Sequence, residues 1–115
     1  MEILSISHGY VSCQLHAREE LLAPNGYLHA GVVVTVADTA CGYGCVKSKP
    51  SDAKLFTTIE LKSNFLGTIK PPSVLSCEAR LIHGGKTTQI WDAQVKDAQK
   101  NKLIAIFRCT QLLIY

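Results

Sequence analysis

Residues Asn25–Cys45 read NGYLHAGVVVTVADTACGYGC, and the fold assignment rests on this segment. It is mostly apolar, and Asp38 is its only carboxylate. A carboxylate in apolar surroundings is rarely fully buried unless it is paired or hydrogen-bonded, because desolvation penalises the ionised form. Asp38 therefore requires a structural or functional explanation.

The same segment carries two conflicting signals. The β-branched run from Val32 to Val36 favours a buried strand. Beyond it, small residues recur every four positions, as in Ala37, Cys41 and Cys45, which is a helical spacing. Because a strand of this length would be unusual and packing often overrides propensity, we predict one buried helix from about His29 to about Lys47. Its small side chains would let it lie close to a covering sheet.

The start of this helix offers unsatisfied backbone donors. Pro24-Asn25-Gly26 is a turn leading in, so the amides of His29-Ala30-Gly31 would lack intrahelical acceptors. Such amides, aided by the helix dipole, stabilise negative charge that develops on an oxygen atom. Asp38 would lie roughly 12–14 Å further along the axis. One helix therefore does not bring Asp38 to an atom held against Ala30, unless the substrate spans the gap or the incoming chain folds back.

Four motifs, in order along nearly the whole chain, carry a family resemblance. His29-Ala30-Gly31 followed by Ala37-Asp38-Thr39-Ala40 resembles the HGG…D signature of hotdog-fold acyl-CoA thioesterases of the PaaI type. Thr57–Leu66 is similar to the family's strand after the helix, and His83–Thr87 to its later turn. Arg108–Gln111 is similar to its last strand.

The resemblance implies an α+β hotdog fold, in which a curved antiparallel sheet wraps around one long central helix. It also implies a homodimer with active sites between subunits, assembled further into a tetramer. In such a site Asp38 would act as nucleophile or general base, and the Ala30 or Gly31 amide would polarise the thioester carbonyl. A hydroxyl from the partner subunit, Thr58 by position, would help to place the attacking water. His29 is expected to support the turn by hydrogen bonding.

The implied substrate is the thioester of a small or medium acyl or aryl group with coenzyme A. No cofactor or metal is expected, since coenzyme A enters as part of the substrate. Lys86 stands where relatives meet the phosphates of coenzyme A. The residues expected to contact substrate or coenzyme A are Asn25, Asn64, Gly84, Gly85, Lys86 and Thr87.

Two departures from the family pattern leave a second function open. Ala30 replaces the first glycine of the HGG pair, and Ala23 stands where many relatives carry Asn. Both alter the front of the site, so the alternative is a non-catalytic hotdog module that binds acyl-CoA or holds a dimer together. Asp38 would then be a structural carboxylate. We expect Tyr43 and Trp91 in the core rather than in the walls of an acyl pocket.

Alternating apolar residues predict the remaining elements as strands. The first strand would run from Ile3 to about Ala17, with Gly9 marking a bulge. Three later strands are predicted at Leu75–Leu81, Trp91–Val95 and Leu103–Ile114. The last of them is apolar on both faces and should therefore be central or covered. The clearest alternation, between helix and Gly67, would put Leu55, Thr57, Ile59, Leu61 and Phe65 on one face and Thr58, Glu60, Lys62 and Asn64 on the other.

Turn signals join these strands in hairpin order. Gly84-Gly85 predicts a hairpin whose glycines adopt positive φ angles, and Asp97–Asn101 predicts another. One helix and four following strands in this order indicate an antiparallel α+β domain over residues 1–115.

Composition excludes several protein classes. Twelve Lys and Arg against nine Asp and Glu give a net charge of +3 over 115 residues, without a basic run interleaved with aromatics, so we expect no nucleic-acid partner. No signal peptide or membrane-length apolar run is recognised. The five cysteines lie in apolar segments, so we expect reduced core thiols in a cytoplasmic protein.

Overall fold

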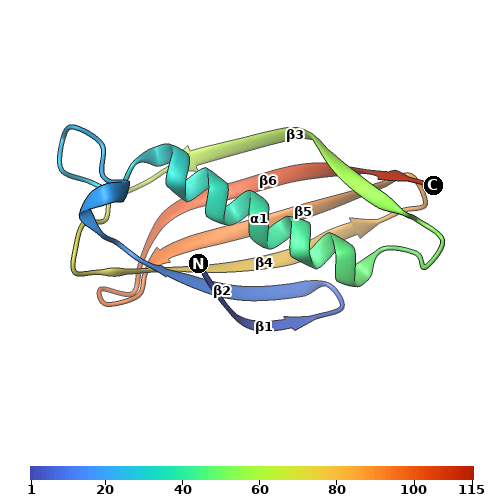
Figure 1. The fold of residues 1–115 in the computed structure, drawn as a ribbon, viewed down its shortest axis with the longest axis horizontal. Coiled ribbons are helices and arrows are strands. Elements are labelled where there is room, and N and C mark those ends of the chain that lie inside the picture. Colours follow the sequence, from blue (N-terminus) through green and yellow to red (C-terminus); the bar gives the residue numbers. More distant parts are fainter.

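The computed structural model describes residues 1–115, as one long helix lying across one face of a six-stranded antiparallel sheet (Figure 1). The predicted architecture of a sheet curved around a single helix is confirmed. The strand order is β1-β2-β4-β5-β6-β3, so β1 and β3 are the two edges. No helix of the structure combines the length and apolar character needed to cross a bilayer. The elements are β1 (Glu2–Ser7), β2 (Tyr10–His16), the short 3-10 helix η1 (Glu19–Leu21), α1 (Ala30–Ser48), β3 (Leu55–Phe65), β4 (Val74–Gly84), β5 (Thr88–Asp97) and β6 (Lys102–Ile114).

Helix α1 follows the predicted bounds to within one residue at each end. The β-branched run from Val32 to Val36 lies inside it, so packing outweighs strand propensity here. Small residues on its inner face let the sheet approach closely. A Cβ atom added at Gly44 would stand only 2.4 Å from Cη2 of the fully buried Trp91, so this contact requires a glycine.

The amino-terminal prediction of one strand with a bulge was wrong, because the segment forms two strands. Ser7 pairs with Tyr10 across a tight turn, in which Gly9 has a φ of 76°. The apolar alternation continues through a turn this short, so periodicity alone does not reveal the reversal. The Gly9 amide donates to Ser48 Oγ at 2.8 Å and ties the hairpin to the end of α1.

The face assignment of β3 was also wrong beyond its middle. The register with β6 shifts between Thr58 and Glu60, a bulge that reverses which residues point inward. Paired residues share a sheet face, and Thr58 lies opposite the buried Gln111. After the bulge Leu61 lies opposite the buried Cys109. Thr58 and Leu61 therefore both face the helix side.

The predictions for the other strands are confirmed. The inward residues of β4 and β5 are buried, and β6 lies between β5 and β3 as a central strand. The hairpin at Gly84-Gly85 forms, but neither glycine has a positive φ. Gly85 instead serves close approach, since a Cβ atom there would lie 3.2 Å from the Thr88 carbonyl oxygen.

All five cysteines are buried and none forms a disulfide, as their apolar surroundings predicted. Burial raises the pKa of the Cys45 thiol to about 11. The pKa of Cys41 is also raised, first by its hydrogen bond with Cys109 and then by burial.

Candidate active site

Asp38 lies in the middle of α1, half-buried, at the edge of a cavity. Its Oδ1 accepts a hydrogen bond from Thr58 Oγ at 3.0 Å, whereas Oδ2 makes no hydrogen bond within the chain. The cavity has a volume of about 300 Å³ and is lined by Asp38, Thr39, Gly42, Tyr43, Val46 and Phe56. A carboxylate oxygen is thus free to meet a ligand in a mostly apolar setting.

Gln111 supports this carboxylate from behind. Its Oε1 lies 2.9 Å from Thr58 Oγ, and its side chain is 0% exposed on the inner face of β6. The Thr58 hydroxyl has one proton and cannot donate it both to Gln111 and to Asp38. Gln111 Nε2 in turn donates to Cys109 Sγ at 3.4 Å. The Thr58 hydroxyl therefore lies between two acceptors, Asp38 Oδ1 and Gln111 Oε1, and can donate to one of them at a time.

Sequence reasoning did not identify Gln111 as a functional residue. The available signal was a single amide among the inward positions of β6, which are otherwise apolar: Ala105, Phe107, Cys109 and Leu113. A buried amide needs hydrogen-bond partners, so its position points to a polar neighbour.

The Thr58 hydroxyl reaches Asp38 of its own chain. The resemblance had implied that the hydroxyl beside this carboxylate comes from a partner subunit. The pairing is local because β3 runs beside α1, and its bulge follows Thr58 directly. This pair therefore does not depend on a second copy.

The start of α1 leaves one amide free. His29 is the N-cap, and its Nδ1 accepts a hydrogen bond from the Gly31 amide at 2.8 Å. The Val32 amide donates to the His29 carbonyl at 2.9 Å, whereas the Ala30 amide donates to no group of the chain. Of the two amides suggested by the sequence, only that of Ala30 is available. The hydrogen bond that His29 accepts from Gly31 is the kind of support for the turn that the sequence suggested.

Gly31 is required by this cap. A Cβ atom at Gly31 would stand 2.9 Å from Nδ1 of His29, too close for a side chain. The second glycine of the HGG pattern is thus kept for the histidine, whereas Ala30 at the first position is tolerated.

A second cavity, of about 260 Å³, lies at this end of the helix and is here called the N-terminal cavity. His29, Ala30 and Asn25 line it together, as does Ala23. Asn25 Oδ1 accepts from the Tyr27 amide at 3.1 Å, which stabilises the incoming turn. The structure therefore places Asn25 and Ala30 in the lining of the same cavity.

The two cavities share no lining residue. Ala30 and Asp38 are eight positions apart, which corresponds to about 12 Å along the helix. The incoming chain does not fold back to close this gap. Within one chain the free amide and the carboxylate cannot act on the same carbonyl group.

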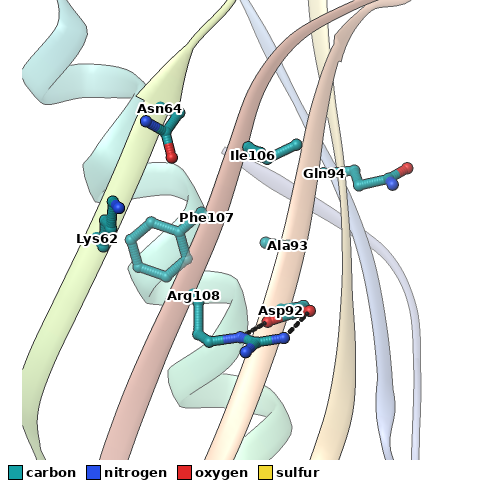
Figure 2. Close-up of a pocket in the computed structure, with 8 residues that line it drawn as sticks. All are labelled: Lys62, Asn64, Asp92, Ala93, Gln94, Ile106, Phe107 and Arg108. Atoms are coloured by element: carbon teal, nitrogen blue, oxygen red, sulfur yellow. Dashed lines mark hydrogen bonds and ion pairs between the residues drawn. The ribbon is translucent and has the colours of Figure 1, made fainter.

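Asn64 lies away from both groups, contrary to its expected place in the site. Figure 2 shows Asn64 and Lys62 on the sheet face opposite the helix, in a cavity of about 290 Å³. Arg108 and Asp92 form a two-point ion pair in the same cavity. The β3 bulge explains the error, because Thr58 and Asn64 were predicted to share a face and lie on opposite ones.

The predicted coenzyme A turn, Gly84–Thr87, lies between β4 and β5 near the carboxyl terminus. The Lys86 carbonyl accepts from the Tyr115 hydroxyl, and the Thr87 carbonyl accepts from the Leu113 amide at 2.9 Å. These contacts fix the backbone of the turn. Neither the Asp38 cavity nor the N-terminal cavity includes any of its residues.

Trp91 and Tyr43, the two aromatic residues expected in the core, differ in burial. Trp91 is buried, and its Nε1 donates to Gln89 Oε1 at 2.8 Å. Tyr43 is 50% exposed and forms a wall of the Asp38 cavity, so its assignment to the core was wrong. The regularly spaced small residues of α1 face the sheet, so Tyr43 lies on the opposite side of the helix. No cluster of His, Cys, Asp or Glu side chains has the arrangement of a metal site.

Comparison with known proteins supports one family. The model of the Thioesterase superfamily matches residues 25–104. The chain is 37% identical over 110 residues to 1,4-dihydroxy-2-naphthoyl-CoA hydrolase from Listeria monocytogenes serotype 1/2a (strain 10403S), covering 96% of this chain and 87% of that protein. It is 27% identical over 109 residues to acyl-coenzyme A thioesterase PaaI from Escherichia coli (strain K12), covering 94% and 74%.

A solved structure agrees with these relatives. A mutant of a thioesterase from Staphylococcus aureus subsp. aureus Mu50 superposes with a TM-score of 0.93 at 27% identity, covering 99% of this chain and 93% of that one. The chain therefore belongs to the thioesterase superfamily, as a PaaI-like thioester hydrolase of hotdog fold.

Proposed function

We propose that the protein hydrolyses acyl-CoA thioesters at sites formed between two copies of the chain. The observation that carries the proposal is the Asp38 carboxylate, which is held by Thr58 and has one oxygen free at an apolar cavity. The free Ala30 amide supplies the second requirement, a donor for negative charge on the carbonyl oxygen. The reaction uses water and needs no cofactor beyond the coenzyme A of the substrate.

A second copy would join the two half-sites. β3 is an open sheet edge, and apolar side chains are exposed along it and on the adjacent face of α1, among them Leu61, Phe65, Tyr43 and Val46. Two-fold pairing along this edge would set two helices antiparallel, so that the start of one helix could lie against the middle of the other. The Ala30 amide of one copy would then face Asp38 of its partner. Pairs of such dimers would form the expected tetramer.

The chemistry assigns one role to each group. Asp38 Oδ2 takes a proton from water, and the resulting hydroxide attacks the thioester carbon. The Ala30 amide holds the oxyanion as the C=O bond opens. When that bond reforms, the C–S bond breaks and coenzyme A leaves as the thiolate, which takes up a proton to give the thiol. Direct attack by Asp38, with a mixed anhydride that water then cleaves, is the alternative sequence.

The walls of the Asp38 cavity suggest the acyl group. Tyr43 and Phe56 present aromatic rings, and a volume of about 300 Å³ suits a small or medium acyl or aryl group. The Listeria relative is named for an aryl-CoA substrate, which agrees with this choice. The free buried thiols fit a cytoplasmic location, where cysteines stay reduced.

The test is thiol release from a panel that includes acetyl-, hexanoyl-, benzoyl- and palmitoyl-CoA. Loss of general-base catalysis in Asp38→Asn should lower kcat by roughly 100-fold or more, because this form of catalysis typically contributes that much. Asp52→Asn, which changes an exposed carboxylate in the loop after α1, is the matched control and should leave kcat unchanged.

Two results would contradict the proposal. Equal rates for folded wild type and Asp38→Asn would remove Asp38 from the chemistry. Tight binding of acyl-CoA without thiol release would identify the non-catalytic module instead. Light scattering checks the shared site separately, since an active monomer would exclude it.

A further inference from the structure

A row of polar side chains crosses the inner face of the sheet beneath α1. Thr58 of β3 lies opposite Gln111 of β6, which in turn lies opposite Gln89 of β5. Gln111 is 0% exposed and Gln89 is 1% exposed, in an interior that is otherwise mainly hydrophobic. Because an amide group is costly to bury without hydrogen bonds, each glutamine needs partners that an apolar residue would not need.

Gln111 is linked to the candidate catalytic carboxylate through a single hydroxyl group. Its Nε2 donates to Cys109 Sγ at 3.4 Å, and this bond turns Oε1 toward Thr58. The Oγ atom of Thr58 lies 2.9 Å from Gln111 Oε1 and 3.0 Å from Asp38 Oδ1. The side chain of Gln111 therefore acts on Asp38 only by way of Thr58.

The choice of acceptor for the Thr58 hydroxyl depends on the charge of Asp38. The hydroxyl has one proton to donate, and a charged acceptor forms a hydrogen bond about twice as strong as a neutral one. An ionised Asp38 therefore takes this hydrogen bond. Once Oδ2 has accepted a proton, Oδ1 is the carbonyl oxygen of a neutral acid, which is a weaker acceptor than the amide oxygen of Gln111. Rotation about the Cβ–Oγ bond of Thr58 then redirects the proton without moving any heavy atom.

We propose that Gln111 is a positioning residue for the hydrolysis, the alternate acceptor to which the Thr58 hydroxyl turns when Asp38 becomes protonated. The inference rests on the proposed function. In this step an O–H bond of water breaks and the Oδ2–H bond forms, whereas the O–H bond of Thr58 stays intact and only changes direction. When Asp38 releases its proton, the hydroxyl turns back. Gln111 thus stabilises the protonated state of Asp38 and makes the carboxylate a stronger base.

The charged residues of the neighbouring strands do not face Asp38. Glu60 and Lys62 are the charged residues of β3, and both lie on the sheet face away from the helix. Glu60 pairs with Thr110, which points outward, and Lys62 lines the cavity on that face together with Arg108 (Figure 2).

The remaining titratable groups near Asp38 lie on α1 or would come from a second copy. Cys41 is one turn further along the helix, and its hydrogen bond with Cys109, followed by its burial, raises its pKa, so the thiol stays neutral. Tyr43 shares the cavity with Asp38. In the proposed dimer the other copy adds His29, whose Nδ1 already accepts a backbone amide. Substitutions at position 111 leave all these groups in place.

The experiment follows the ionisation of Asp38 in Gln111→Met, which keeps the length of the side chain but lacks the acceptor. The Thr58 hydroxyl then has only Asp38 to donate to, so protonation of Asp38 is no longer compensated. The pH midpoint of the Asp38 carboxyl ¹³C resonance, assigned with Asp38→Asn, should fall by roughly half to one pH unit, the size of one hydrogen bond. The acidic limb of kcat should move in the same direction. At neutral pH kcat should fall roughly two- to fivefold, because the base is weaker.

Gln89→Met is the matched control. Gln89 is as buried as Gln111, but its Oε1 accepts from Trp91 Nε1 at 2.8 Å and makes no hydrogen bond with Thr58. Its replacement should destabilise the fold to a similar degree and leave the Asp38 midpoint unchanged. Gln111→Glu keeps the shape of the side chain and its acceptor oxygens, so it should not lower the midpoint.

A double-mutant cycle tests whether Gln111 acts through the hydroxyl. In a Thr58→Val background, Gln111→Met should have no further effect on the midpoint or on kcat. An equal effect with and without the hydroxyl would overturn the inference, as would a lowered midpoint in Gln111→Glu.

The sign of the shift in Gln111→Met is decisive. An unchanged midpoint would reject the alternate acceptor, and a raised midpoint would mean that the amide donates to Thr58 Oγ instead of accepting from it. If the wild type hydrolyses no thioester, the proposed function fails. The ¹³C titration needs no substrate, so it still tests the exchange of the hydroxyl between Asp38 and Gln111.

Discussion

Replacing Gly44 by alanine should destabilise the protein, although the same change is normally favourable inside a helix. The added Cβ atom would stand 2.4, 2.7 and 2.9 Å from three ring carbons of Trp91. Unstrained carbon atoms approach to about 3.5–4.0 Å, so the overlap is about 1 Å. Trp91 is 0% exposed and donates to Gln89, so the ring has no space to turn away. The helix must lift from the sheet instead.

The magnitude follows from two opposing terms. Overpacking a close-packed core costs about 1–3 kcal/mol, and an overlap with three ring atoms belongs at the upper end. Alanine in place of glycine inside a helix gains about 1 kcal/mol. The net loss in the free energy of unfolding should be about 2 kcal/mol.

Gly42→Ala is the matched control for Gly44→Ala. It receives the same gain from helix propensity, but its Cβ atom would meet only the ring of Phe56, with Cζ at 3.1 Å and Cε2 at 3.5 Å. Phe56 is half-buried beside the Asp38 cavity and can shift into it. We expect Gly42→Ala to be neutral or slightly stabilising.

Urea unfolding followed by circular dichroism and by the fluorescence of the single tryptophan measures both variants. The two probes should agree. Equal stability of Gly44→Ala and Gly42→Ala would refute a close contact between α1 and Trp91.

Two further predictions concern hydrogen-bonded carboxylates. Thr58→Val keeps the shape of the side chain but removes the hydrogen bond to Asp38, so kcat for acyl-CoA should fall by roughly 10- to 100-fold, whereas Thr58→Ser should retain most activity; a Val variant with wild-type kcat would exclude this role. Burial favours the neutral form of Asp97, but hydrogen bonds from Ser73 and from two backbone amides outweigh it and lower its pKa. A lowered folded-state pKa adds stability above the unfolded value of about 3.9 that is lost as pH falls. The advantage of wild type over Asp97→Asn in urea unfolding should therefore be full at pH 7 and shrink below about pH 4, and a gap constant from pH 7 to pH 3 would contradict it.

The sequence predicted α1 because the helical and strand signals differ in length. A run of five β-branched residues suggests a strand, but the small residues that follow extend the apolar segment beyond any ordinary strand. The prediction of one amino-terminal strand around Gly9 failed because the turn there is too short, whereas the helix was recognised because its segment is long. A tight turn interrupts the alternation for too few residues to break its period, so two strands were read as one.

The candidate site was predictable in part for similar reasons. Asp38, His29 and Ala30 were identified from one segment, since their order along a helix fixes their spacing. Asn64 was misplaced because a bulge changes the facing of every later residue, and no local pattern marks it. Gln111 was missed because its role depends on a partner 53 positions away in sequence.

The close approach of α1 to the sheet also constrains how such a protein adapts to new substrates. Trp91 is pressed against Gly44, so the helix and the sheet leave no room between them at this point. Under the proposed function, the selection of the acyl group would therefore fall to residues on the outward side of the helix, such as Tyr43 and Val46. Those side chains contribute little to the packed interior. Mutations there can alter which acyl group is accepted while folding stability is preserved, so substrate preference and thermodynamic robustness are free to evolve separately.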